Sequence, residues 1–147
     1  MSDDLLRPTI RTSAGTARPW RVSSQAYVAF FGGVLAVTTI AFLNSGKLGM
    51  AARERRLVLL IGGVALAAEL VLAHLIADLV AINALRLIIR AVALLGYFAQ
   101  ARLQHTAERV FQLRGGEHAS LWGPGFGALF GCGIPEALLV AVVVWTA

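Results

Sequence analysis

A short series of polar residues interrupts the apolar stretch from Leu57 to Gln100, and these residues have types and spacings that could do chemistry. The stretch is too long for one membrane span and about right for two, so we expect a helical hairpin with its turn near Ile82. Within each arm two of them, His74 and Asp78 or Arg86 and Arg90, lie four apart and therefore share a helix face. The series consists of Glu69, His74, Asp78, Asn83, Arg86 and Arg90.

Glu69 is the main candidate for a functional residue in this series. It falls well inside its predicted span, near the bilayer midplane, where a carboxylate costs roughly 2.5–3.5 kcal/mol on insertion scales. We therefore expect its side chain to face the bundle interior or a wet cavity. Two interpretations stay open: a structural acid bonded across helices or paired with Arg90, or an acid that loads and releases a proton or cation.

The other polar residues of the hairpin give a structural expectation. Asp78 should lie opposite Arg86, where an ion pair would close the hairpin, and His74 should lie opposite Arg90. Arg90 can extend toward the membrane surface, and His74 can accept a hydrogen bond or titrate. His74 and Asp78 share a face, but two ligands do not make a metal site, so we predict none.

No other catalytic pattern is present in the sequence. Nucleophile–base pairs and a phosphate-cradling glycine motif with a following lysine are absent. We therefore predict a protein that is not an enzyme and needs no cofactor.

Composition places the chain in a membrane. Its 147 residues are 58% hydrophobic and only 14% charged, and the mean hydropathy is +0.74. A soluble domain needs more polar surface than this, and the continuous apolar runs favour helices over an alternating β-barrel pattern. The net charge of +5 comes from arginines beside apolar runs, which favours contact with anionic lipid of the bilayer over nucleic acid.

The pattern predicts an all-α membrane protein, a four-transmembrane-helix bundle with a tight central hairpin. Residues 1–24 read as a flexible basic tail, and residues 25–147 form the membrane domain. We expect the third helix to continue beyond its span as a rod whose last turns lie on or project from the membrane surface. The apolar face of that extension would consist of Leu103, Ala107, Val110 and Phe111. The predicted spans are 25–43, 57–79, 84–102 and 120–146.

Glycines mark two candidate packing faces. Gly32 and Gly33 leave a flat strip on the first span, and Gly123, Gly127 and Gly131 recur every four residues on the last. The second set forms a groove for a neighbouring helix, in the same chain or in another copy. The run after Pro135 is too short to cross alone, so the last span must include this glycine region, with a kink at Pro135.

Two loop regions carry a resemblance to other proteins. Arg18-Pro-Trp, Phe30-Phe-Gly-Gly and Leu43-Asn-x-x-Lys-Leu-Gly49 stand around the first span, and Arg114-Gly-Gly-Glu-His-Ala-Ser-Leu-Trp122 precedes the last. These segments resemble those of small uncharacterised multi-pass bacterial integral membrane proteins. The resemblance implies the architecture and no catalytic residue. We expect the chain in the cell inner (plasma) membrane.

Two functional hypotheses follow from the sequence. The first is a non-enzymatic packing or accessory subunit that self-associates or binds another membrane protein through its small-residue faces. The alternative is an oligomeric channel, or a proton- or cation-coupled small transporter, centred on Glu69. Because four short helices enclose little volume, we expect a conduction path to need several copies.

Overall fold

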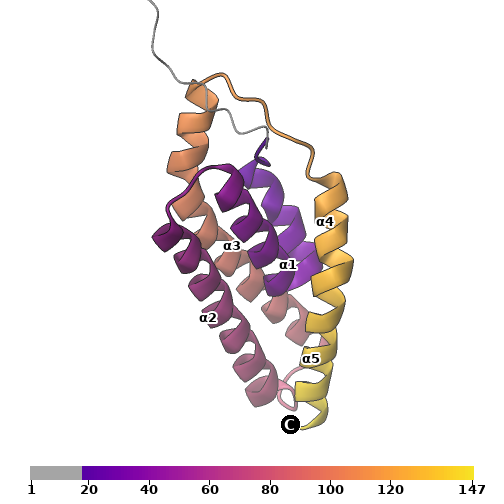
Figure 1. Cartoon of the computed structure of the whole chain (residues 1–147). Helices are drawn as coiled ribbons and strands as arrows, with labels where there is room; N and C mark the ends of the chain where they lie inside the picture. The colour runs from indigo at the N-terminus through magenta and orange to yellow at the C-terminus, as the bar shows by residue number, and fades with distance from the viewer. Residues whose placement is uncertain (1–17) are drawn as a thin grey trace, which may run out of the picture.

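The computed structural model describes residues 18–147, which fold into a bundle of helices (Figure 1). Most of the predicted tail lies outside the described residues. Four segments are long and apolar enough to cross a membrane, Val22–Lys47, Ala52–Ile76, Ile82–Leu113 and Trp122–Trp145, which confirms the predicted all-α class. The elements are η2 (Val22–Ser24), α1 (Gln25–Lys47), α2 (Ala52–Ile76), α3 (Ile82–Leu113), α4 (Trp122–Ala128), the π-helical η3 (Leu129–Gly133) and α5 (Ile134–Trp145).

The first apolar segment folds back on itself instead of running straight. Gly33 has φ +82° and ψ −165°, which breaks α1 into two halves. A straight helix of 23 residues would place its ends roughly 34 Å apart. However, the backbone N–H of Trp20 donates to Asn44 Oδ1 at 2.7 Å, and Lys47 Nζ lies 3.5 Å from the centroid of the Trp20 ring. Residues 25–32 and 34–47 therefore form an antiparallel helical hairpin, seen as two short neighbouring purple helices (Figure 1).

This hairpin makes the first segment re-entrant: it enters and leaves at the same end of the bundle. The expectation that residues 25–43 cross the membrane in one helix is therefore wrong, although the segment is as long and apolar as predicted. Glycine adopts a positive φ without a steric penalty, so the Gly33 turn is accessible where another residue would be strained. The remaining segments α2, α3 and α4 through α5 run along the bundle, and the C-terminus lies at the end opposite residue 18 (Figure 1).

Helices α2 and α3 form the tight hairpin that the sequence predicts, with its turn at residues 77–81. Helix α3 has 32 residues, about 48 Å at 1.5 Å per residue, and so is longer than a bilayer core is thick. The side of its extension that packs against the bundle is polar, not the apolar face named above. Gln104 and Glu108 are buried, whereas Val110 is exposed and Phe111 only half-buried. Polar residues face inward here because the open end of the re-entrant hairpin carries backbone groups that need partners.

The last segment continues from α4 through η3 into α5 and packs on the re-entrant hairpin. The irregularity expected at Pro135 lies one turn earlier, in the π-helical η3, consistent with the clash between a proline ring and the preceding turn. A Cβ on Gly133 would lie 2.9 Å from the carbonyl oxygen of Gly32. Two glycines thus allow the backbones of η3 and the hairpin tip to approach closely.

Candidate intramembrane site

The tip of the re-entrant hairpin carries backbone groups that no helix satisfies. Because α1 breaks at Gly33, the N–H groups of Val34 and Leu35 begin a new half-helix. Both donate to one side chain: Val34 N lies 2.9 Å from Glu136 Oε1, and Leu35 N lies 2.5 Å from Glu136 Oε2. The carbonyl oxygen of Phe31, at the end of the first half-helix, accepts from Arg90 Nη1 at 3.2 Å.

The charges of these two partners match the helix ends that they contact. The N-terminus of a helix carries partial positive charge and the C-terminus partial negative charge. Glu136 therefore stabilises the start of the returning half-helix, and Arg90 stabilises the end of the entering one. Irregular backbone at membrane depth occurs only where protein groups satisfy it or where it lines a water-filled cavity. Here Glu136 and Arg90 are the protein groups that satisfy the irregular backbone.

Glu69 completes the group of charged residues below the hairpin tip. It is fully buried, with 0% of its surface exposed, and neither a backbone N–H group nor a cationic side chain of the described residues bonds to its carboxylate oxygens. It lines one cavity together with Glu136 and Arg90. Arg90 acts electrostatically on both acids, and the carboxyl groups of Glu69 and Glu136 lie close enough to interact directly. Among the described residues no ion pair joins Arg90 to Glu69. With both acids ionised, one guanidinium neutralises only one of two carboxylates.

The cavity has a volume of about 600 Å³ and lies mainly between α3 and α5. These two helices do not pack against each other, although both are fully described. The cavity extends from the hairpin tip at Gly32 to Ile82 and Trp145, which lie at the end of the bundle that holds the α2–α3 turn. Its walls are mostly aliphatic, and Arg86 lies at its exposed rim. The arrangement is a vestibule that Glu69 lines in part, although the surface of Glu69 itself is fully buried.

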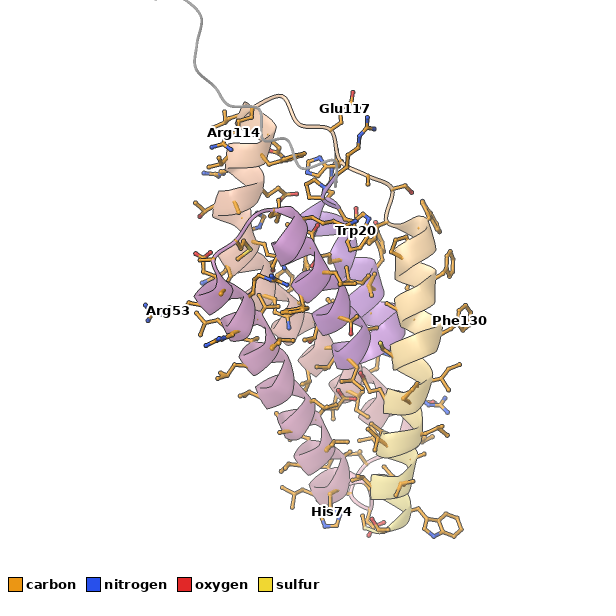
Figure 2. The ribbon with its side chains drawn as sticks, in the orientation of Figure 1. Trp20, Arg53, His74, Arg114, Glu117 and Phe130 are labelled. Carbon is orange, nitrogen blue, oxygen red and sulfur yellow. The ribbon has the colours of Figure 1, made fainter. Side chains whose placement is uncertain are left out.

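The predicted pairs across the α2–α3 hairpin do not form. Among the described residues no ion pair joins Asp78 to Arg86 or His74 to Arg90. Helix α2 ends at Ile76, so helical spacing does not direct the Asp78 side chain. His74 is exposed and points outward at the lower end of α2 (Figure 2). Arg90 instead donates to the Phe31 carbonyl group at the break in α1. Leaving that carbonyl group without a donor costs more free energy than leaving a surface histidine unpaired.

The predicted glycine faces have different environments. Gly32 and Gly33 are buried at the hairpin tip, and a Cβ on Gly33 would overlap Glu136 Oε1. Gly123, Gly127 and Gly131 are exposed, and a Cβ on any of them would meet nothing within 4 Å in the described chain. No helix within residues 18–147 therefore covers the second face. Packing of that face against another copy stays a prediction.

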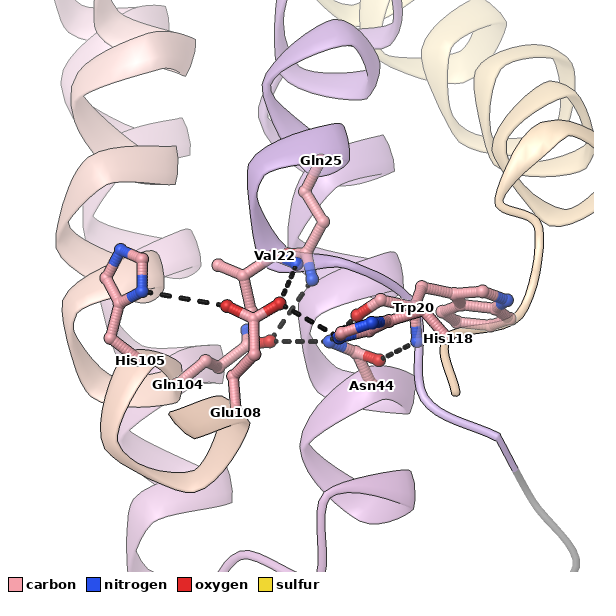
Figure 3. Close-up of polar contacts among 8 residues, drawn as sticks. All are labelled: Trp20, Val22, Gln25, Asn44, Gln104, His105, Glu108 and His118. Atoms are coloured by element: carbon pink, nitrogen blue, oxygen red, sulfur yellow. Dashed lines mark hydrogen bonds and ion pairs between the residues drawn. The ribbon is translucent and has the colours of Figure 1, made fainter. Parts of the chain in front are cut away.

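A second polar cluster closes the open end of the hairpin (Figure 3). Glu108, only 6% exposed, accepts from Val22 N at 2.8 Å. His118 Nε2 lies 3.3 Å from its Oε1, and His105 Nδ1 lies 3.6 Å from its Oε2. These contacts attach the segment before α1 and the loop after α3 to one carboxylate, so the cluster has a structural role.

One amide in the same cluster connects both arms of the hairpin. Gln104 Oε1 accepts from Gln25 Nε2 at 3.1 Å and from Asn44 Nδ2 at 3.0 Å. Gln25 belongs to the entering arm and Asn44 to the returning arm. Helix α3 thus holds the two arms together.

The sequence pattern singles out Glu69 as a candidate but does not indicate that Glu136 holds the hairpin tip. The sequence predicts only a kink at the neighbouring Pro135. The available signal was a second carboxylate inside an apolar segment, combined with a Gly-Gly pair in the middle of another apolar segment. A buried acid needs donors, and a broken helix offers them.

Comparison with protein-family models, curated proteins and solved structures finds no match to this chain. The resemblance to small bacterial membrane proteins therefore stays an expectation. Within residues 18–147, no three His, Cys, Asp or Glu side chains gather in a way that could hold a metal ion.

Proposed function

We propose that this multi-pass membrane protein is not an enzyme and carries a proton or a monovalent cation through the site at Glu69. One observation carries the proposal: a fully buried carboxyl group lines a cavity, and neither a backbone N–H group nor a cationic side chain of the described residues bonds to it. An ionisable residue at membrane depth is by default a candidate for an ion pathway. One positive charge at Glu69 would neutralise the site.

The re-entrant hairpin supports a transport role for the cavity. Broken helices with half-helix ends near the bilayer midplane are a common way for transporters to build a charged site. Here the hairpin tip, at Gly32 and Phe31, forms the inner end of the vestibule. A single chain therefore supplies one half of a pathway, and a movement of the hairpin would open the other half.

Flux measurements on purified protein in liposomes test this proposal. Vesicles containing a pH-sensitive dye are given a potassium diffusion potential with valinomycin, and proton entry is compared with sodium entry. We expect flux with the wild type and a loss of at least tenfold in Glu69→Gln, because the amide cannot exchange a proton or balance a cation. Glu117→Gln is the matched control, since that side chain is 77% exposed in a surface ion pair with Arg18. Equal flux in Glu69→Gln and wild type would reject the proposal.

A second candidate function is that of an accessory subunit in the inner membrane, assembled through the α4–η3 face. The favouring observation is that Gly123, Gly127 and Gly131 are exposed and open. Small residues at this spacing allow helices of two chains to approach closely. We expect Gly127→Leu to reduce the mass of the detergent-solubilised complex, and Gly63→Leu, at an equally open glycine of α2, to leave it unchanged. A monomeric wild type would exclude self-association.

A further inference from the structure

We infer that the cavity between α3 and α5 binds a small lipophilic organic cation, which reaches Glu69 from within the bilayer. This inference rests on the proposed function and specifies the class of ligand. It depends on three features of the cavity: its charge, its size and wall chemistry, and its opening.

The charge of the inner end selects a cation. Glu136 is engaged by two backbone N–H groups, and Arg90 by the Phe31 carbonyl. Glu69 is fully buried and has neither a backbone nor a cationic hydrogen-bond partner among the described residues. Its carboxyl group interacts with that of Glu136, a second acid. A protonated amine supplies both the missing positive charge and hydrogen-bond donors for a carboxylate. An anion would instead meet two carboxyl groups.

The size and walls of the cavity select an organic ligand. About 600 Å³ falls within the range of roughly 300–1,000 Å³ that is typical of small-molecule sites. A bare ion would occupy a small fraction of it. Apolar side chains from α3 and α5 form most of the wall, among them Leu85, Ile89, Val140 and Val144, and Phe31 adds an aromatic ring. Such walls bind a hydrocarbon or aromatic body.

The opening of the cavity selects entry from lipid. Helices α3 and α5, each described over its full length, do not pack against each other. Ala137 and Ala141 line the cavity and are exposed, so small side chains border the gap. Arg86 stands at the outer rim, where its long side chain can reach the headgroups. An amphipathic cation in the bilayer has the same arrangement, with its apolar part in the hydrocarbon and its charge near the headgroups.

Binding of three compounds with the same skeleton tests the inference. Phenylbutylamine, phenylbutanol and phenylbutyrate differ only in a cationic, neutral or anionic head. Their affinities are measured by isothermal titration calorimetry on protein in lipid nanodiscs, with empty nanodiscs subtracted to remove partitioning. We expect wild type to bind the amine at least tenfold more tightly than the alcohol and to show no binding of the carboxylate. Equal affinities for amine and alcohol would overturn the inference.

Two variants connect binding to the cavity. We expect Glu69→Gln to bind the amine about thirtyfold more weakly, the usual loss when one partner of a buried charge pair is removed. Ala141→Phe fills the cavity without removing a charge and should abolish amine binding while unfolding at the wild-type temperature. Glu117→Gln should bind as wild type does. Unchanged amine affinity in folded Ala141→Phe would also overturn the inference.

The two proposals fail in different ways. Proton or sodium flux that depends on Glu69, together with equal binding of amine and alcohol, rejects the organic ligand and keeps the carrier. Selective amine binding that depends on Glu69, without flux of any tested ion, keeps the ligand site and rejects the ion carrier.

Discussion

The side-chain amide of Asn44 forms hydrogen bonds with both backbone groups of Trp20, which lies 24 positions earlier in the chain. Asn44 Oδ1 accepts from the Trp20 N–H at 2.7 Å, and Asn44 Nδ2 donates to the Trp20 carbonyl at 3.0 Å. This pair of bonds holds the two ends of the α1 hairpin together. The first segment therefore returns to the end where it began, and only α2, α3 and α4 through α5 run along the bundle. As a result, the two ends of the described chain lie at opposite ends of the bundle (Figure 1).

Labelling of single cysteines would test the re-entrant path. With Cys132 replaced by alanine, we expect Arg21→Cys and Gly49→Cys to react with a membrane-impermeant maleimide from one side. Ala147→Cys should react only from the other side. A straight first span would instead place residues 21 and 49 on opposite sides, so that result would contradict the hairpin.

Removal of the Asn44 side chain should destabilise the fold. Asn44→Ala leaves the buried N–H of Trp20 without its acceptor, and an unsatisfied buried group costs about 1–3 kcal/mol. We expect a lower unfolding temperature in detergent than for wild type. Asn83→Ala is the matched control, because Asn83 is exposed at the start of α3. Equal unfolding temperatures for the two variants would contradict the role given to Asn44.

Substitution of Gly33 should be harmful even by alanine. A residue with a side chain is strained by about 1–3 kcal/mol at this backbone conformation, which is essentially restricted to glycine, and its Cβ would also displace Glu136 from the half-helix. We expect a lower unfolding temperature for Gly33→Ala. Gly63→Ala should unfold at or above the wild-type temperature, since Gly63 has open space around it and alanine is the better helix former.

Glu136→Gln should loosen the hairpin tip. The amide oxygen can accept from one of the two N–H groups, but the NH2 group cannot accept from the other. Hydrogen–deuterium exchange of the peptide that contains Val34 and Leu35 should be roughly tenfold faster, given about 1.5 kcal/mol or more for a hydrogen bond to a charged group. Exchange at wild-type rates would show that Glu136 does not hold the tip. Glu117→Gln serves as the control.

The architecture followed from the sequence to the extent that length and hydropathy determine it. The apolar runs identified the membrane segments, and the polar residues near Ile82 identified the tight hairpin. Neither quantity distinguishes a straight helix from a folded one, because the first segment is as apolar as a true span. The Gly32-Gly33 pair predicts a packing surface, whereas in the structure Gly33 makes the turn.

The site was only partly predictable for a related reason. Glu69 stood out because it is an isolated acid in an apolar run. The structural role of Arg90 depends on a carbonyl group 59 positions away, which no local pattern indicates. The buried polar face of α3 did carry a signal, since Gln100, Gln104 and Glu108 recur every four residues. This spacing can be read as a buried polar face only when the ends of the α1 hairpin are known to need polar partners.

The hairpin tip also determines when this protein can finish folding during its synthesis. The donors at Val34 and their acceptor at Glu136 are separated by 102 positions, and Val22 is 86 positions from Glu108. A ribosome therefore releases the first apolar segment long before the residues that satisfy its turn exist. Until then the insertion machinery receives a segment that qualifies as an ordinary span. The native path of the N-terminal segment is thus completed only after the last helix has been made.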